Sequence, residues 1–154
     1  MSLEPTPGKL SADLLKALHG IKPVQQFPKG GTLFEQGSAV TGVYLLERGE
    51  VRLLLSTGVG QKQLLEVVGP GNVLGLSESM SGERHRISAE AGEDAMAVFI
   101  PRTEFLAFLR EHGDFCMQVV QLLSEDLHGL YHKFRSISAH PGRPRQRPLD
   151  EQLN

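Results

Sequence analysis

The chain has one cysteine, Cys116, among its 154 residues, and it has no long apolar run. A single thiol excludes a disulfide framework, a four-thiolate zinc site and an iron–sulfur cluster within one chain. It also fits a reducing compartment. No stretch approaches the roughly 20 apolar residues of a membrane-spanning helix, and the N-terminus MSLEPTPGK lacks the apolar core of a signal peptide. We therefore expect a cytoplasmic protein with no membrane partner.

Neither sign of charge dominates the sequence. Lysine and arginine number 16 and aspartate and glutamate 18, so the net charge is −2 and the composition does not indicate a nucleic-acid partner. Hydrophobic residues make up 40% and charged residues 22%, which is typical of a globular chain and not of a disordered one. The length fits one domain with a core of its own.

The motifs of nucleophile elbows, zinc proteases and phosphate-binding loops are all missing from the sequence. A metal-dependent enzyme of the cupin type would need several histidines and a carboxylate on its barrel strands, where this chain offers essentially only His85. His128 and His132 lie four apart on a predicted helix and could hold a metal only with a third ligand such as Glu125. We interpret them as surface histidines, and Cys116 as a buried small apolar residue. The sequence predicts no enzyme and no metal site.

Residues 24–100 consist of short apolar or alternating runs that glycines separate at close intervals. The run VRLLLS (51–56) alternates between two sets of side chains, which predicts a strand with two unlike faces. Many short strands with turn signals between them favour an antiparallel barrel or sandwich. Ahead of this region, the leucine spacing in residues 10–18 predicts a short amphipathic helix.

The periodicity becomes helical after Pro101, a residue that favours a helix start. We expect a short helix that is broken at Gly113, and then a long helix over about residues 114–138. Apolar positions in the long helix repeat in steps of four and three, which is the seam of a coiled coil. We expect a homodimer with an interface formed by Val120, Leu123, Leu127, Leu130, Phe134 and Ile137. The proline-rich residues 139–154 are predicted to be a disordered tail.

Three phrases of this sequence are similar to the effector domain of the Crp/Fnr regulators, a cyclic-nucleotide-binding domain. They are KGGTLFEQGSAVTGVYLLERGEVRLLL (29–55), VVGPGNVLGLS (67–77) and FIPRTEFLAFL (99–109). The resemblance implies a mainly β fold with flanking helices: an antiparallel double-stranded β-helix, or jelly-roll, barrel at about 24–100, a short helix and a long dimerisation helix. Residues 1–138 would then form one ligand-sensing domain.

The resemblance also implies a ligand cassette in the barrel. We expect its residues to be Gly75, Leu76, Ser77, Glu78, Arg84, His85 and Arg86. The family's ribose-binding glutamate falls on Gly75 and its phosphate-binding arginine on His85, so cyclic AMP binding with the usual geometry is disfavoured. Ser77 is expected to cap the short helix of the cassette. Either Arg84 or Arg86 turns inward to hold a small anion, or both are solvated.

The favoured interpretation is a non-enzymatic sensor of a cyclic nucleotide or another small anion, which dimerises through the long helix. The 16 residues after Ser138 cannot build a DNA-recognition helix, so we expect no DNA binding by this chain alone. Two alternatives stay open. The chain can be the effector domain of a longer DNA-binding regulator, or a dimerisation and interaction module that binds no ligand.

Overall fold

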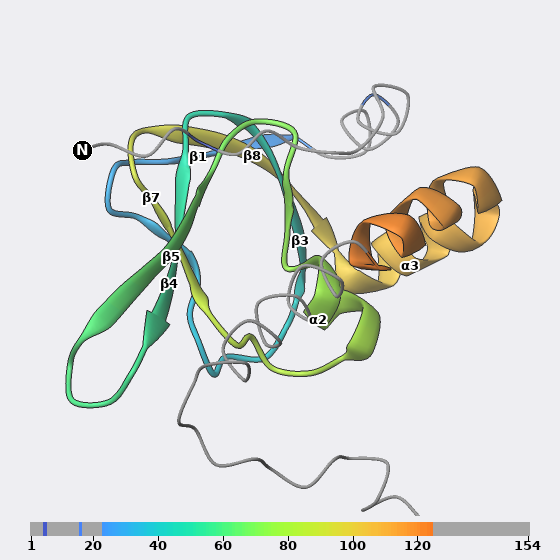
Figure 1. The fold of residues 1–154 in the computed structure, drawn as a ribbon. Coiled ribbons are helices and arrows are strands. Elements are labelled where there is room, and N and C mark those ends of the chain that lie inside the picture. The colour runs from blue at the N-terminus through green and yellow to red at the C-terminus, as the bar shows by residue number, and fades with distance from the viewer. Residues whose placement is uncertain (1–4, 6–15, 17–22, 125–154) are drawn as a thin grey trace, which may run out of the picture. The chain divides into compact units, whose positions relative to one another are not determined.

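The computed structural model describes residues 5, 16 and 23–124. Within them, two four-stranded antiparallel sheets have the strand orders β1-β8-β3-β6 and β2-β7-β4-β5. Figure 1 shows the two sheets curving around a shared interior, which is the predicted jelly-roll architecture. The strands are β1 Val24–Phe27, β2 Thr32–Phe34, β3 Gly42–Arg48, β4 Val51–Ser56, β5 Lys62–Val68, β6 Val73–Leu74, β7 Ser88–Ala91 and β8 Ala95–Pro101; the helices are α2 Leu76–Ser81 and α3 Arg102–Glu111.

Strand β3 separates the two apolar layers of the molecule. On its inner face, Leu46 belongs to the cluster that fills the barrel, and Tyr44 packs against that cluster. The alternate residues Val43 and Leu45 are 0% and 2% exposed and lie on the outer face, because successive side chains of a strand point to opposite sides. Helix α3 packs on β3 and β8 and buries Phe105 there.

Glycine is required at the turn between β3 and β4. Gly49 has a φ of +84°, which other residues adopt only with strain. A Cβ at this position would also overlap the carbonyl oxygen of Asp94 in the neighbouring loop. The glycine spacing that predicted the barrel therefore reflects turns that hold the two sheets close together.

The alternation predicted for β4 is correct only in its first half. Val51 is buried and Arg52 is exposed, as expected for two unlike faces. The register with β5 shifts between Leu53 and Leu54, and Leu54 is buried at 7% exposure. Such a bulge places two residues of one strand opposite one residue of its partner, so the sense of the alternation changes.

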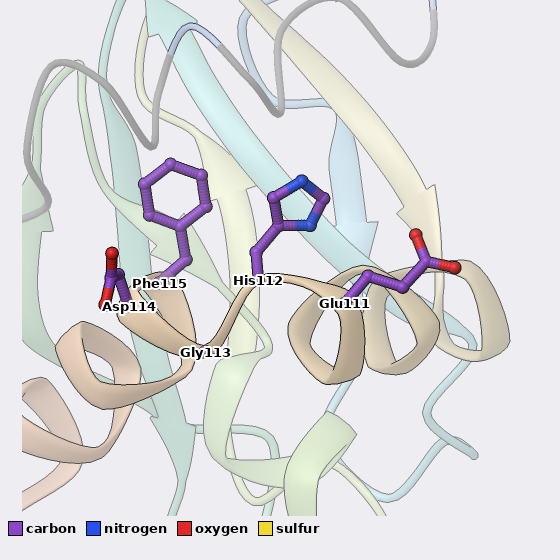
Figure 2. Close-up of a pocket in the computed structure, with 5 residues that line it drawn as sticks. All are labelled: Glu111, His112, Gly113, Asp114 and Phe115. Carbon is purple, nitrogen blue, oxygen red and sulfur yellow. The ribbon is translucent and has the colours of Figure 1, made fainter.

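Helix α3 ends one residue earlier than the sequence predicted. The break lies at His112, and residues 113–124 are helical, so Gly113 belongs to the second helix. Pro101 is the last residue of β8 and precedes α3. The His112 ring stacks on Phe108 with centroids 4.2 Å apart, and its Nδ1 lies 2.9 Å from the Phe108 carbonyl oxygen. These contacts stabilise the bend, beside a shallow cavity of about 320 Å³ (Figure 2).

The chain divides into two compact units, Met1–Val120 and Gln121–Asn154. Only residues 121–124 of the second unit are described, and they are helical. The predicted helix at 10–18 apart from residue 16, the seam positions Leu127, Leu130, Phe134 and Ile137, the histidines at 128 and 132, and the tail at 139–154 lie outside the described residues.

Candidate ligand-binding site

Helix α2 lies beside β3, near α3, and is bounded by two glycines (Figure 1). Gly75 and Gly82 have φ values of +79° and +81°, and the N–H of Gly82 donates to the Glu78 carbonyl. Gly75 is the N-cap, and no side chain caps the helix. The expectation that Ser77 caps α2 is therefore wrong. Ser77 lies inside the helix and is exposed, and Leu76 beside it is buried at 6% exposure.

The structure explains why glycine stands at position 75. A Cβ there would lie 3.1 Å from the Gly42 carbonyl oxygen and 3.4 Å from Cε1 of His85. The positive φ adds strain for any L-residue. A glutamate at this position would need a different backbone, so the ribose-binding carboxylate that the resemblance implies cannot be accommodated at Gly75 in this conformation.

His85 is fixed inside the barrel by its own backbone. Its carbonyl accepts from the Gly37 N–H at 2.8 Å, and its N–H donates to the Ser38 carbonyl at 3.0 Å. These two bonds direct the side chain inward, where it is 3% exposed. The imidazole stacks on the Phe34 ring with centroids 3.9 Å apart and planes 11° apart. The residue at the family's arginine position is thus a buried, firmly held imidazole.

The Glu78 carboxylate lies beside the His85 ring. Its Oε1 lies 3.5 Å from Nδ1 of His85, which is too long for a well-formed hydrogen bond, and Nδ1 has no hydrogen-bond partner. Burial lowers the pKa of His85 below its ordinary value, and the Glu78 carboxylate opposes this by raising it. Because burial is the larger effect, His85 is neutral at pH 7.

Arg84 and Arg86 both lie in solvent, the second of the two arrangements that the sequence left open. The Arg84 guanidinium donates to the Gly37 carbonyl at 2.9 Å. Arg86 is paired with Glu83 at 3.0 Å, and its side chain is 74% exposed. Neither arginine supplies a positive charge to the barrel interior in this conformation.

Two features of the site escaped the sequence analysis. One is a cluster of rings inside the barrel, in which Tyr44 contacts Phe27, Phe34 and Phe99 at centroid distances of 4.9–6.2 Å. Burial raises the pKa of Tyr44. The alternation of residues 42–48 was the available signal, because it places Tyr44 and Leu46 on one face.

The other missed feature is Ser79 of α2. The residue is fully buried, and its Oγ has no hydrogen-bond partner. Its carbonyl accepts from Nε of Arg102 at 2.7 Å, which ties α2 to the first residue of α3. A single serine in a short helix gave no sequence signal for either contact. Together, Ser79 and His85 place two unpartnered polar atoms in or beside the cassette.

The start of the long helix presents part of the predicted seam. Val120 is 47% exposed, whereas Val119 beside it is 1% exposed and packs in the core. Leu123 is half-buried. Cys116 is also half-buried, so its expected full burial is not found in this single chain. At the predicted seam position Val120, this single chain therefore exposes an apolar side chain to solvent.

The part of the chain that the structure describes holds no cluster of three or more histidine, cysteine, aspartate or glutamate side chains that could bind a metal. Among the same residues, no helix has the length and apolar character needed to cross a bilayer.

Residues 24–112, more than half of the chain, match the model of the cyclic nucleotide-binding domain. This match covers the barrel, both cassette segments and α3. The chain therefore belongs to the cyclic nucleotide-binding domain family. Its relatives include regulators of the Crp/Fnr type and also patatin-like phospholipase domain-containing protein 6 of Pongo abelii, which is 24% identical over 65% of this chain and 7% of the relative.

The chain is similar to the cyclic AMP receptor protein of Thermus thermophilus, with 32% identity over 54% of this chain and 39% of the relative. It is 23% identical to the anaerobic regulatory protein of Bacillus subtilis over 91% of this chain and 60% of the relative. It thus spans about two-fifths to three-fifths of these two regulators.

Among solved structures, the Thermus thermophilus catabolite activator protein matches with a TM-score of 0.76 and 25% identity, over 84% of this chain and 61% of that one. A Thermotoga maritima transcriptional regulator also matches with a TM-score of 0.76, at 20% identity, over 82% of this chain and 98% of that one. The second likeness supports the fold alone.

Proposed function

We propose that this chain is a non-enzymatic, cytoplasmic sensor of a small molecule, which binds at the cassette formed by residues 75–78 and 84–86. The main support is that Nδ1 of His85, within the cassette, and Oγ of Ser79, the residue after its first segment, are buried without hydrogen-bond partners. A buried polar group without a hydrogen-bond partner is costly, and a functional role is one of the few explanations for keeping it. The family match and the cyclic AMP receptor among the relatives favour a cyclic nucleotide or another small anion as ligand.

We also propose that the long helix joins two copies of the chain through the predicted seam. The exposed Val120 and the half-buried Leu123 support this, since a coiled coil would bury both. In such a dimer, a change at the cassette can reach the helix through α3, because Arg102 at the start of α3 holds Ser79 of α2. A bistable helix interface would then amplify a small change at the ligand site.

Thermal unfolding with added ligands tests the sensor proposal. A ligand that binds the native state raises the melting temperature, and the rise grows with the logarithm of its concentration above the Kd. We expect a concentration-dependent rise with at least one cyclic nucleotide or small anion in the full chain, and a smaller rise in Ser79→Ala than in Ser77→Ala. A melting temperature that none of these compounds changes would favour the interaction module that binds no ligand.

Replacing Val120 with aspartate tests the dimer. Because Val120 is exposed in the single chain, a charge there is tolerated by the monomer, but in the seam it would be buried without a partner. We expect Val120→Asp to sediment as a monomer at micromolar concentration, while the wild type and Gln121→Asp, whose position lies off the seam, sediment as dimers. A monomeric wild type would contradict the dimer.

A further inference from the structure

The cassette lacks a fixed positive charge where an anion would need one. His85 stands at the position that the resemblance assigns to the phosphate-binding arginine, and its imidazole is buried and stacked on Phe34. The flanking Arg84 and Arg86 are directed to solvent and engaged by the Gly37 carbonyl and by Glu83. An anion that enters the described cassette therefore meets a neutral ring and no guanidinium.

The groups that face His85 make the site electronegative at neutral pH. From α2 comes the Glu78 carboxylate, 3.5 Å from Nδ1. From β2 comes the uncharged ring of Phe34, and behind it stands the Tyr44 phenol, whose pKa burial raises, so it is neutral as well. Gly75, which also lies next to the His85 ring, has no side chain and contributes only backbone atoms there. A carboxylate in a partly buried site repels an incoming anion strongly, because the local dielectric constant is low.

We propose that the cassette takes up a small oxyanion together with one proton, which the His85 imidazole accepts as the ligand enters. This inference rests on the proposed sensor function. The proton comes from solvent and forms a second N–H bond on the ring, so that both ring nitrogens become donors. Nδ1 can then donate to Glu78, and Nε2 is available to the ligand in a charge-assisted hydrogen bond. The imidazolium thereby donates to both the carboxylate and the oxyanion, and its single positive charge offsets one of their negative charges.

Coupling of the two binding events has a measurable signature. If the bound anion raises the proton affinity of His85, then by linkage a proton on His85 raises the affinity for the anion. Binding should therefore tighten as the pH falls, by up to about tenfold per pH unit above the pKa of the ligand-free imidazole. A site that uses a permanent guanidinium would not show this dependence.

Isothermal titration calorimetry of the full chain tests the proposal, with cyclic AMP and, separately, sulfate as probes. Neither compound changes its charge between about pH 5 and 8, the range in which histidine titrates. Each titration is repeated in two buffers of different ionisation enthalpy, which gives the number of protons taken up. We expect net proton uptake above the pKa of ligand-free His85, approaching one proton per bound anion where the pH lies between the pKa values of the free and the ligand-bound imidazole. Binding of cyclic AMP alone identifies a nucleotide phosphate as the ligand, and binding of sulfate identifies a simple oxyanion site.

Three variants test whether His85 is the residue that takes up the proton. His85→Gln should abolish both the uptake and the pH dependence, whereas His112→Gln, at an exposed histidine outside the cassette, should keep them. Glu78→Gln removes the repelling carboxylate, so its affinity near the upper end of the pH range should exceed that of the wild type. Binding that does not depend on pH, or equal uptake in the wild type and His85→Gln, overturns the inference and leaves the sensor function standing. If neither cyclic AMP nor sulfate binds at any pH, the result contradicts the proton-uptake inference and the sensor function together.

Discussion

The two helices beside β3 pack in opposite ways. Helix α3 covers the outer face of the sheet with Phe105, which is 1% exposed and lies among apolar neighbours. Helix α2 packs beside β3, and near it Oγ of Ser79 and Nδ1 of His85 are buried without hydrogen-bond partners. The first interface resembles an ordinary protein core, whereas the second retains polar groups that cost stability.

The difference indicates what each helix contributes. Burial of an aromatic side chain of this size stabilises the fold by several kcal/mol, while each unpartnered polar atom costs about 1–3 kcal/mol. An arrangement that only stabilised the barrel would place apolar residues at positions 79 and 85. We infer that α3 holds the fold together and that the cassette sacrifices stability for binding. Three substitutions test this contrast.

Phe105→Ala should have the largest effect, because it opens a cavity in the interface between α3 and the sheet. We expect the free energy of unfolding to fall by about 3–5 kcal/mol, as measured by denaturant titration. Met117→Ala, at a side chain that is 58% exposed, is the control and should change stability by less than about 0.5 kcal/mol. Equal losses of stability in the two variants would contradict the inference that packing of α3 on the sheet holds the fold together.

His85→Phe should stabilise the protein by about 1–2 kcal/mol, because it keeps a ring on Phe34 and removes a buried polar atom. Its effect should also depend on pH. Because the pKa of His85 is lowered in the folded state, the unfolded chain binds the proton first. The wild type therefore loses stability as the pH falls below about 6.5, the ordinary pKa of histidine, and continues to lose it down to the folded-state pKa.

The stability difference between His85→Phe and the wild type should accordingly widen on acidification. Chemical denaturation of both proteins at a series of pH values measures this difference in the free energy of unfolding. His112→Phe, which replaces an exposed histidine that also stacks on a phenylalanine, serves as the matched control. A constant difference across the pH range would mean that His85 does not titrate as a buried neutral imidazole.

Ser79→Ala should have the smallest effect. We expect the free energy of unfolding to rise by about 1 kcal/mol, because the substitution removes a buried hydroxyl that has no hydrogen-bond partner. Ser77→Ala, two residues earlier on the exposed side of the same helix, should stay within about 0.5 kcal/mol of the wild type. Destabilisation by Ser79→Ala would show that the hydroxyl has a structural role in α2.

Much of the barrel could be predicted from the sequence, because its turns depend on residue type. Gly49 needs a positive φ and leaves no room for a side chain, so its place between two strand runs was informative. The prediction for β4 was wrong beyond Leu53, because a bulge depends on pairing with β5 and leaves no local pattern. The end of α3 was misplaced by one residue for a similar reason, since the contacts of the His112 ring with Phe108 accompany the break one residue before Gly113.

The cassette was predictable as a region but not in its chemistry. Resemblance placed residues 75–78 and 84–86 together, and the structure brings Gly75, Glu78 and His85 into proximity. Which of Arg84, His85 and Arg86 points inward follows from the backbone bonds to Gly37 and Ser38, which join segments far apart in the sequence. Side-chain direction set by such long-range pairing cannot be derived from local periodicity.

Hydrogen exchange of the backbone amides, followed by mass spectrometry with and without cyclic AMP or sulfate, tests the central claim most directly. If the cassette binds the ligand, exchange should slow in peptides covering residues 75–86, while the β4–β5 hairpin at 57–61 keeps its rate. Protection that appears elsewhere and leaves residues 75–86 unchanged would contradict the assignment of this cassette as the sensor site.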